Sequence, residues 1–93
     1  MSGIVYEAGT YINITGTGAV SANRGVLLGF YVNNTSGGTL VLRDGGASGT
    51  VMSGTITPAI GFHRFPAAFV TSLYATIANT LDVTFFFQVG STT

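Results

Sequence analysis

Apolar and polar residues alternate one by one over several short segments, and this constrains the fold more than any other feature of the sequence. In residues 81–89 the odd positions are apolar, whereas Asp82, Thr84 and Gln88 lie between them. The same two-residue period recurs in residues 52–58 and 73–78, and no segment of useful length has a capped helical period. Because the side chains of a strand point alternately to two faces, the pattern predicts strands with one apolar face packed into a core.

Glycine, asparagine and aspartate separate these segments, at the places where turns are needed. Residues 33–38 (NNTSGG) lie between the apolar segments 26–32 and 39–43, and Asp44-Gly45-Gly46 follows directly. Such residues supply the turn conformations that connect antiparallel strands. The spacing predicts an all-β fold: a single antiparallel β-sandwich, jelly-roll-like, with about seven or eight short strands.

The chain divides into two parts at about residue 24. Residues 25–93 carry most of the alternating pattern and are predicted to form the β-sandwich domain. Residues 1–24 have strand character at 4–6 and 11–14 but are otherwise small and weakly patterned. Two interpretations stay open for them, an edge hairpin with a loop or an arm that adds a strand to a neighbouring molecule.

Charged residues make up only 6% of the chain, against about 25% in an ordinary soluble domain, and the formal net charge is zero. They are Glu7, Arg24, Arg43, Asp44, Arg64 and Asp82. A chain with so few charges cannot stay dispersed by charge repulsion, so we expect other chains to cover much of its surface. Three scattered arginines and no lysine also argue against binding to nucleic acid.

Residues for catalysis, metal binding or membrane insertion are scarce. His63 is the only histidine, there is no cysteine, and no nucleophile elbow is present. The run 44–50 (DGGASGT) lacks the Gly-Lys ending of a phosphate-binding loop. The longest apolar stretches, 26–32 and 83–87, fall far short of the roughly 20 residues of a membrane helix. We therefore expect a protein that is not an enzyme, binds no cofactor or metal and does not enter a membrane; residues 1–6 also lack the pattern of a signal peptide.

Several large apolar side chains fall on the strand face opposite the expected core. If the core takes the larger apolar set in each segment, then Leu27, Tyr31, Val41 and Phe86 point outward. In one interpretation the chain's own loops cover them, or a few exposed apolar side chains are simply normal. In the other they form a patch that is buried against another subunit. We predict an interface made by these four residues together with Tyr6 and Tyr11 in the N-terminal segment.

Six segments in order resemble small β-rich proteins encoded by tailed bacteriophages. The segments are 25–35 (GVLLGFYVNNT), 38–45 (GTLVLRDG), 54–58 (GTITP), 65–69 (FPAAF), 73–77 (LYATI) and 82–85 (DVTF). Some of these phage proteins are capsid decoration (cement) proteins with jelly-roll or sandwich folds. The shared elements are strands, turns and prolines, so the resemblance implies a fold more specifically than a role, and it brings no catalytic or ligand residues.

The composition and the resemblance together lead to one hypothesis. The protein is expected to be a virion structural protein, a head decoration subunit that folds in the host cytoplasm, forms a homotrimer or homodimer, and bridges subunits of the major capsid protein. An alternative of a different class is a tail-associated or secreted carbohydrate-binding β-sandwich module, in which Tyr31, Tyr74 or Phe62 would stack on sugars.

Overall fold

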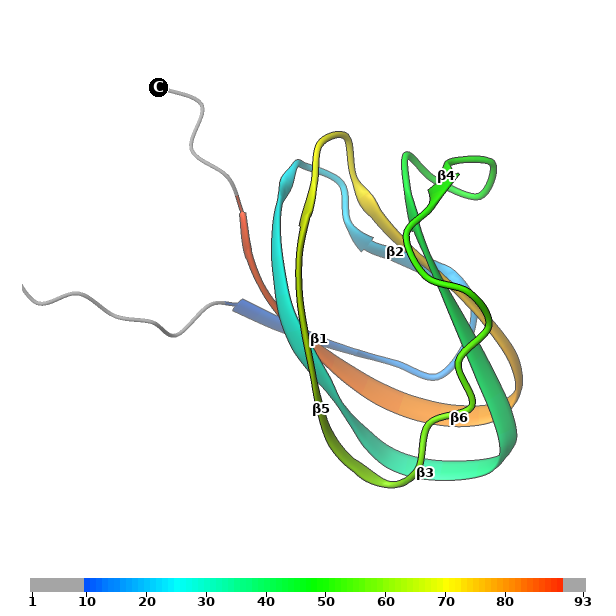
Figure 1. Cartoon of the computed structure of the whole chain (residues 1–93). Coiled ribbons are helices and arrows are strands. Elements are labelled where there is room, and N and C mark those ends of the chain that lie inside the picture. The colour runs from blue at the N-terminus through cyan, green and yellow to red at the C-terminus, as the bar shows by residue number, and fades with distance from the viewer. Residues whose placement is uncertain (1–9, 90–93) are drawn as a thin grey trace, which may run out of the picture.

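The computed structural model describes residues 10–89, which form one antiparallel sheet of six strands (Figure 1). The strands are β1 (Thr10–Ile14), β2 (Gly18–Ser21), β3 (Gly25–Asp44), β4 (Thr50–Val51), β5 (Gly61–Phe69) and β6 (Leu73–Val89). The sheet order is β1-β6-β3-β4, with β2 also paired to β6 and β5 also paired to β3. Residues 10–89 contain no helix, so the prediction of an all-β antiparallel fold is confirmed.

Strands β3 and β6 form one long ribbon that runs through the whole sheet, from the pair Gly25–Val89 to the pair Asp44–Leu73. Its register shifts at three places along β3, in residues 27–29, 32–34 and 36–37. Such bulges bend a strand and increase its twist. The ribbon therefore curls, and Figure 1 shows β3 and β6 wrapping around the interior of the molecule.

The shorter strands extend the two halves of this ribbon. In the half formed by residues 25–32 and 83–89, β5 pairs with β3 and β1 pairs with β6. In the other half, β4 pairs with the end of β3 and β2 pairs with the start of β6. Residues 10–21 thus lie within the sheet, whereas residues 1–9, and with them part of the predicted arm, lie outside the described residues.

The sheet has fewer and longer strands than the turn residues predicted. Residues 33–38, expected to form a turn, instead continue β3 and stay paired with β6 through two of the register shifts. Gly37 takes a positive φ of 65°, and Thr80 of β6 pairs with both Ser36 and Gly37. Segments 26–32 and 39–43 are therefore one bent strand, and the two halves belong to one continuous sheet rather than to two separate sheets.

The interior is filled by the alternating residues of β6 and by apolar residues of β3. The buried side chains of these strands are Leu27, Phe30, Val32, Leu40, Leu42, Leu73, Ala75, Leu81, Val83, Phe85 and Phe87. The predicted core face of residues 81–87 is confirmed, but Val89 at the end of the strand is 50% exposed. Met52 and Ile56, from a segment expected to be a longer strand, still pack against this core.

Asp44 joins the end of β3 to the turn between β5 and β6. Its carboxylate accepts hydrogen bonds from the backbone N–H groups of Val70 at 2.7 Å, Thr71 at 2.9 Å and Ser72 at 3.3 Å. These N–H groups, above all that of Val70, hold the pKa of Asp44 below its usual value. Arg43, its neighbour in sequence, instead donates to the carbonyl oxygen of Gly49 at 3.2 Å.

The Asp44→Asn variant is expected to be less stable at pH 7 by about 1 kcal/mol. The hydrogen bonds use both carboxylate oxygens, whereas an amide keeps only one acceptor oxygen, which is neutral and accepts more weakly. A lowered pKa in the folded state contributes stability above the unfolded value, about 3.9, and that contribution is lost as the pH falls through the folded value. Urea denaturation at pH 7 and at pH 3 should therefore show a difference between wild type and variant that shrinks at pH 3. An equal difference at both pH values would contradict this role for Asp44.

Candidate interaction face

Four aromatic side chains from four strands meet on the outer side of the sheet, and we call them the aromatic face. They are Tyr11 of β1, Phe86 of β6, Tyr31 of β3 and Phe62 of β5. The register places Tyr11 opposite Phe86, and Tyr31 opposite Phe62. Tyr11 is 72% exposed, Phe62 56% and Tyr31 42%, while Phe86 is half-buried. Four neighbouring strands thus present a continuous aromatic surface.

A glycine at the centre of the aromatic face allows two of its rings to meet. Gly29 pairs with Phe86 on one side and with Arg64 on the other. A Cβ atom at Gly29 would lie 2.8 Å from Cζ of Phe62 and 2.6 Å from the carbonyl oxygen of His63. The absence of a side chain at Gly29 therefore lets the ring of Phe62 lie over β3 and reach that of Phe86, with 6.1 Å between the ring centroids.

A polar cluster borders the aromatic face toward the bend of the ribbon. The Asn13 amide nitrogen donates to Asp82 Oδ1 at 2.6 Å and to Thr84 Oγ1 at 3.1 Å. The Asn33 amide nitrogen donates to the same two atoms at 3.4 Å and 3.1 Å. Two neutral amides from flanking strands therefore hold the Asp82 carboxylate in a fixed position on the outer surface.

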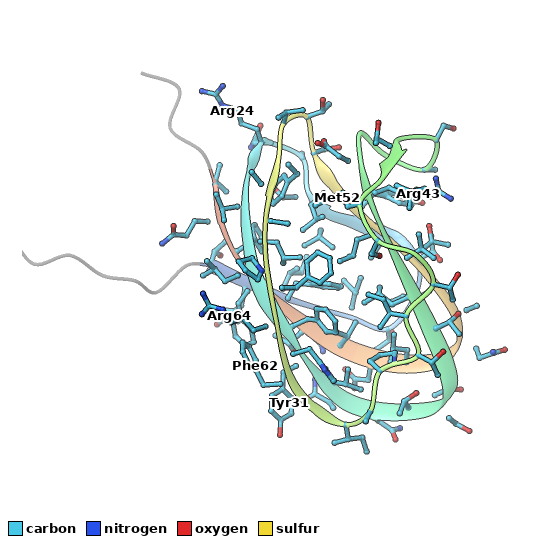
Figure 2. The ribbon with its side chains drawn as sticks, in the orientation of Figure 1. Arg24, Tyr31, Arg43, Met52, Phe62 and Arg64 are labelled. Carbon is cyan, nitrogen blue, oxygen red and sulfur yellow. The ribbon has the colours of Figure 1, made fainter. Side chains whose placement is uncertain are left out.

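Arg64 lies at the opposite border of the aromatic face, on the edge strand β5. Figure 2 shows Tyr31, Phe62 and Arg64 on the side of the molecule that lies away from Arg43. Arg64 is exposed, and within residues 10–89 it forms no hydrogen bond or ion pair. The aromatic face thus has a fixed carboxylate on one side and, on the other, a guanidinium that has no partner among the described residues.

Three of the six residues predicted for an interface belong to this face, namely Tyr11, Tyr31 and Phe86. Val41 points outward too, but it is half-buried, pairs with Thr76 and lies in the other half of the ribbon. Tyr6 lies outside the described residues. The structure therefore gathers half of the predicted set on one surface and separates Val41 from it.

The prediction that Leu27 points outward is wrong, because Leu27 has no exposed surface. Leu27 pairs with Phe87 and Gly29 with Phe86, so β3 uses two residues where β6 uses one. Leu28 is the extra residue of this bulge, and it reverses the alternation. As a result Leu27 faces the core together with Phe30 and Val32, and Val26 is 39% exposed instead.

Phe62 is the member of the aromatic face that the predicted interface lacked. Residues 61–69 mix apolar residues on both strand faces, so their alternation is weak. The inner residues His63, Phe65, Ala67 and Phe69 include a histidine, and the outer residues 62, 64, 66 and 68 include a phenylalanine. Knowing that Arg64 has to point outward would have placed Phe62 on the outer face as well.

His63, the single histidine of the chain, makes contacts that hold its ring within the fold. Its Nε2 atom lies 2.8 Å from the carbonyl oxygen of Ala59, and its ring lies against Phe30 with 5.2 Å between centroids. Over the described part of the chain, no three His, Asp or Glu side chains gather into a possible metal site. The same residues include no helix that is long and apolar enough to span a membrane.

Comparisons of the chain with protein-family models, with curated proteins and with solved structures gave no match. The resemblance to phage decoration proteins therefore stays a prediction, and the surface of the molecule itself has to carry the functional argument. On that surface the aromatic face is the largest group of exposed aromatic side chains within residues 10–89.

Proposed function

We propose that this protein is a virion structural protein, a head decoration subunit of a tailed phage that assembles with other protein subunits through its aromatic face. The observation that carries the proposal is the set of three exposed aromatic side chains on one face of the sheet, in a chain with only 6% charged residues. Depletion of charge and enrichment in aromatic residues distinguish the centre of a protein interface from the rest of a surface. The resemblance stated above selects phage decoration among the possible assembly roles.

The exposed aromatic area is large enough to drive association. With about 200 Å² for a whole aromatic side chain, the exposed fractions of Tyr11, Tyr31 and Phe62 give roughly 340 Å². Burying this area would contribute about 8 kcal/mol, and an equally apolar partner surface would contribute as much again. The cost of association is about 4 to 15 kcal/mol. Burial of the face alone therefore offsets the lower part of this range, and burial of both surfaces, about 16 kcal/mol, offsets all of it.

A subunit of this kind would stabilise a shell by mass action. A protein that binds only the assembled shell shifts the equilibrium toward assembly, by about 2.7 kcal/mol per site at a concentration of 100 times its Kd. Such stabilisation requires no catalysis. It suits a small domain in which most interactions of the described side chains are core packing and hydrogen bonds that hold the fold.

The test is to add the purified protein to undecorated heads of the phage that encodes it and to measure occupancy and the temperature at which the heads release DNA. We expect saturable binding and a higher release temperature. Phe62→Ser should bind at least tenfold more weakly, whereas Val51→Ser, which alters a side chain that is 50% exposed in the other half of the ribbon, should bind like the wild type. Unchanged occupancy and unchanged heat resistance on adding wild-type protein would refute the proposal.

Carbohydrate binding is a second candidate, favoured by one observation. The amides of Asn13 and Asn33 converge on Asp82 and Thr84 beside Tyr31, and sugar sites combine an aromatic platform with fixed polar groups. Tyr31 and Phe62 lie side by side, whereas Tyr74 pairs with Arg43 in the other half of the ribbon and cannot share their site. Binding on a glycan array that is lost in Tyr31→Ala, with no binding to heads, would favour this candidate over the first.

A further inference from the structure

We propose that the aromatic face binds the same face of a second copy of this chain, around a two-fold axis that lies along the line from Tyr11 to Tyr31. The inference rests on the proposed function, because it names the first partner of the surface used there. Its basis is the self-complementary arrangement of aromatic and charged side chains on this face.

The register gives the positions of the charged residues relative to Tyr31. Arg64 is on β5, the strand next to that of Tyr31. It pairs with Gly29, which precedes Tyr31 by two residues on β3. Asp82 is on β6, one strand away on the other side, and its backbone pairs with Asn34 on the far side of Tyr31. Neighbouring strands lie about 4.8 Å apart, and alternate residues of one strand about 6.8 Å apart. Tyr31 is therefore close to the midpoint between Arg64 and Asp82.

A two-fold axis through that midpoint exchanges the two charges. When two identical faces pack about an axis in their common plane, residues equally distant from the axis on opposite sides meet across the interface. An axis through Tyr31, at right angles to the line from Arg64 to Asp82, places each Arg64 against the partner's Asp82. One pairing of the faces thus produces two opposite-charge contacts.

The same axis passes over the aromatic residues. Tyr11 is on β1, two strands away from Tyr31, and it is aligned with Phe86 and Gly29 across the sheet. With the strand and residue spacings given above, this position of Tyr11 falls on the axis. Tyr11 and Tyr31 therefore each meet their own symmetry mates, while Phe86 and Phe62 lie beside them. The apolar centre and the charged border fit a single symmetry operation, which a face shaped for an unrelated partner would not require.

The size and the charge state of the face also fit a second copy. The roughly 340 Å² of exposed aromatic area is close to half of the 800 Å² or so that each partner buries in a stable interface. Arg64 has no partner of its own within the described residues, and Asp82 is held in place by Asn13 and Asn33. The chain thus presents one cation and one oriented anion at the positions where a copy would pair them.

Sedimentation equilibrium of the full chain tests the inference through a charge exchange. We expect the wild type to form a dimer, and Arg64→Asp and Asp82→Arg each to raise the dimer dissociation constant at least tenfold, because like charges then face each other. The double variant, which exchanges the two charges, should return to within about threefold of the wild type. Arg24→Asp is the control, since it changes the net charge as Arg64→Asp does but lies on the turn before β3.

The outcomes separate this inference from the proposed function. A monomeric wild type at high protein concentration, single variants that dimerise like the wild type, or a double variant that is not rescued would each overturn the inference. Head binding that persists in any of these cases leaves the decoration role standing, with the capsid as the partner of the face. A dimer that follows the charge exchange but does not bind heads supports the inference and refutes decoration. Circular dichroism of every variant shows whether a loss of dimer reflects loss of the fold.

Discussion

Replacing Leu27 by alanine is expected to lower the free energy of unfolding by about 2 to 5 kcal/mol. Leu27 is completely buried in the core, so its truncation removes apolar contacts and leaves a cavity that the surrounding strands cannot fully close. A domain of this size has a total stability of about 5 to 15 kcal/mol. Urea denaturation followed by circular dichroism should therefore show a midpoint far below that of the wild type.

Val26→Ala is the matched control, since Val26 precedes Leu27 on the same strand and is 39% exposed on the outer face. Its cost should be about 1 kcal/mol or less. Without the bulge at Leu28 the alternation would put Val26 and Leu28 in the core and Leu27 on the surface. A larger loss for Val26→Ala than for Leu27→Ala would mean that the bulge is not where the register places it.

This pair of variants also shows where the sequence stops predicting the structure. In β6 the strand pairs without an extra residue between Leu81 and Phe87, so every second side chain faces the core and the alternation alone located it. In β3 the segment 26–32 is apolar at nearly every position, and the register of the neighbouring strands decides which side chains face inward. The bulge at Leu28 cannot be located from the sequence, because the residues on both faces of this segment are apolar.

The prediction of a turn at residues 33–38 is wrong for a related reason. Asn, Ser and Gly are common in turns, but glycine also suits the type of bulge that has one residue at positive φ, as Gly37 does here. Gly38 is buried, and a Cβ atom there would lie 2.3 Å from the carbonyl oxygen of Thr80. Gly37, with its positive φ, and Gly38, with no Cβ atom, thus allow β3 and β6 to stay paired around the bend.

The aromatic face was predictable only in part, because alternation assigns each residue to a strand face but does not say which strands lie side by side. Alternation within their own segments places Tyr31 and Phe86 outward, whereas Tyr11 is predicted to join the interface without an assignment to a strand face. Their meeting with Phe62 depends on the long-range pairing of β1 with β6 and of β5 with β3. The pattern within a single strand segment provides no information about that pairing.

Phe85→Ala should lower the stability of the core, whereas Phe86→Ala should alter the outer face of the same strand. Phe85 is fully buried, and its ring lies 5.8 Å from that of Phe30. Its truncation should cost about 3 to 5 kcal/mol. For a domain of this size, that corresponds to a fall in Tm of roughly 15 °C or more. Thermal unfolding followed by circular dichroism measures this loss, and a small change in Tm would mean that Phe85 does not lie in the core.

Phe86→Ala tests the outward side with the same chemical change one residue away. Phe86 is half-buried, and its ring contacts that of Phe62, so the stability should fall by only about 1 to 2 kcal/mol. The main loss should appear in association. Head binding should weaken and the dimer dissociation constant should rise, each at least tenfold, because Phe62 then lacks the ring that holds it in the face. A Phe86→Ala protein that remains folded and binds as tightly as the wild type would mean that assembly does not use the aromatic face, whatever surface it does use.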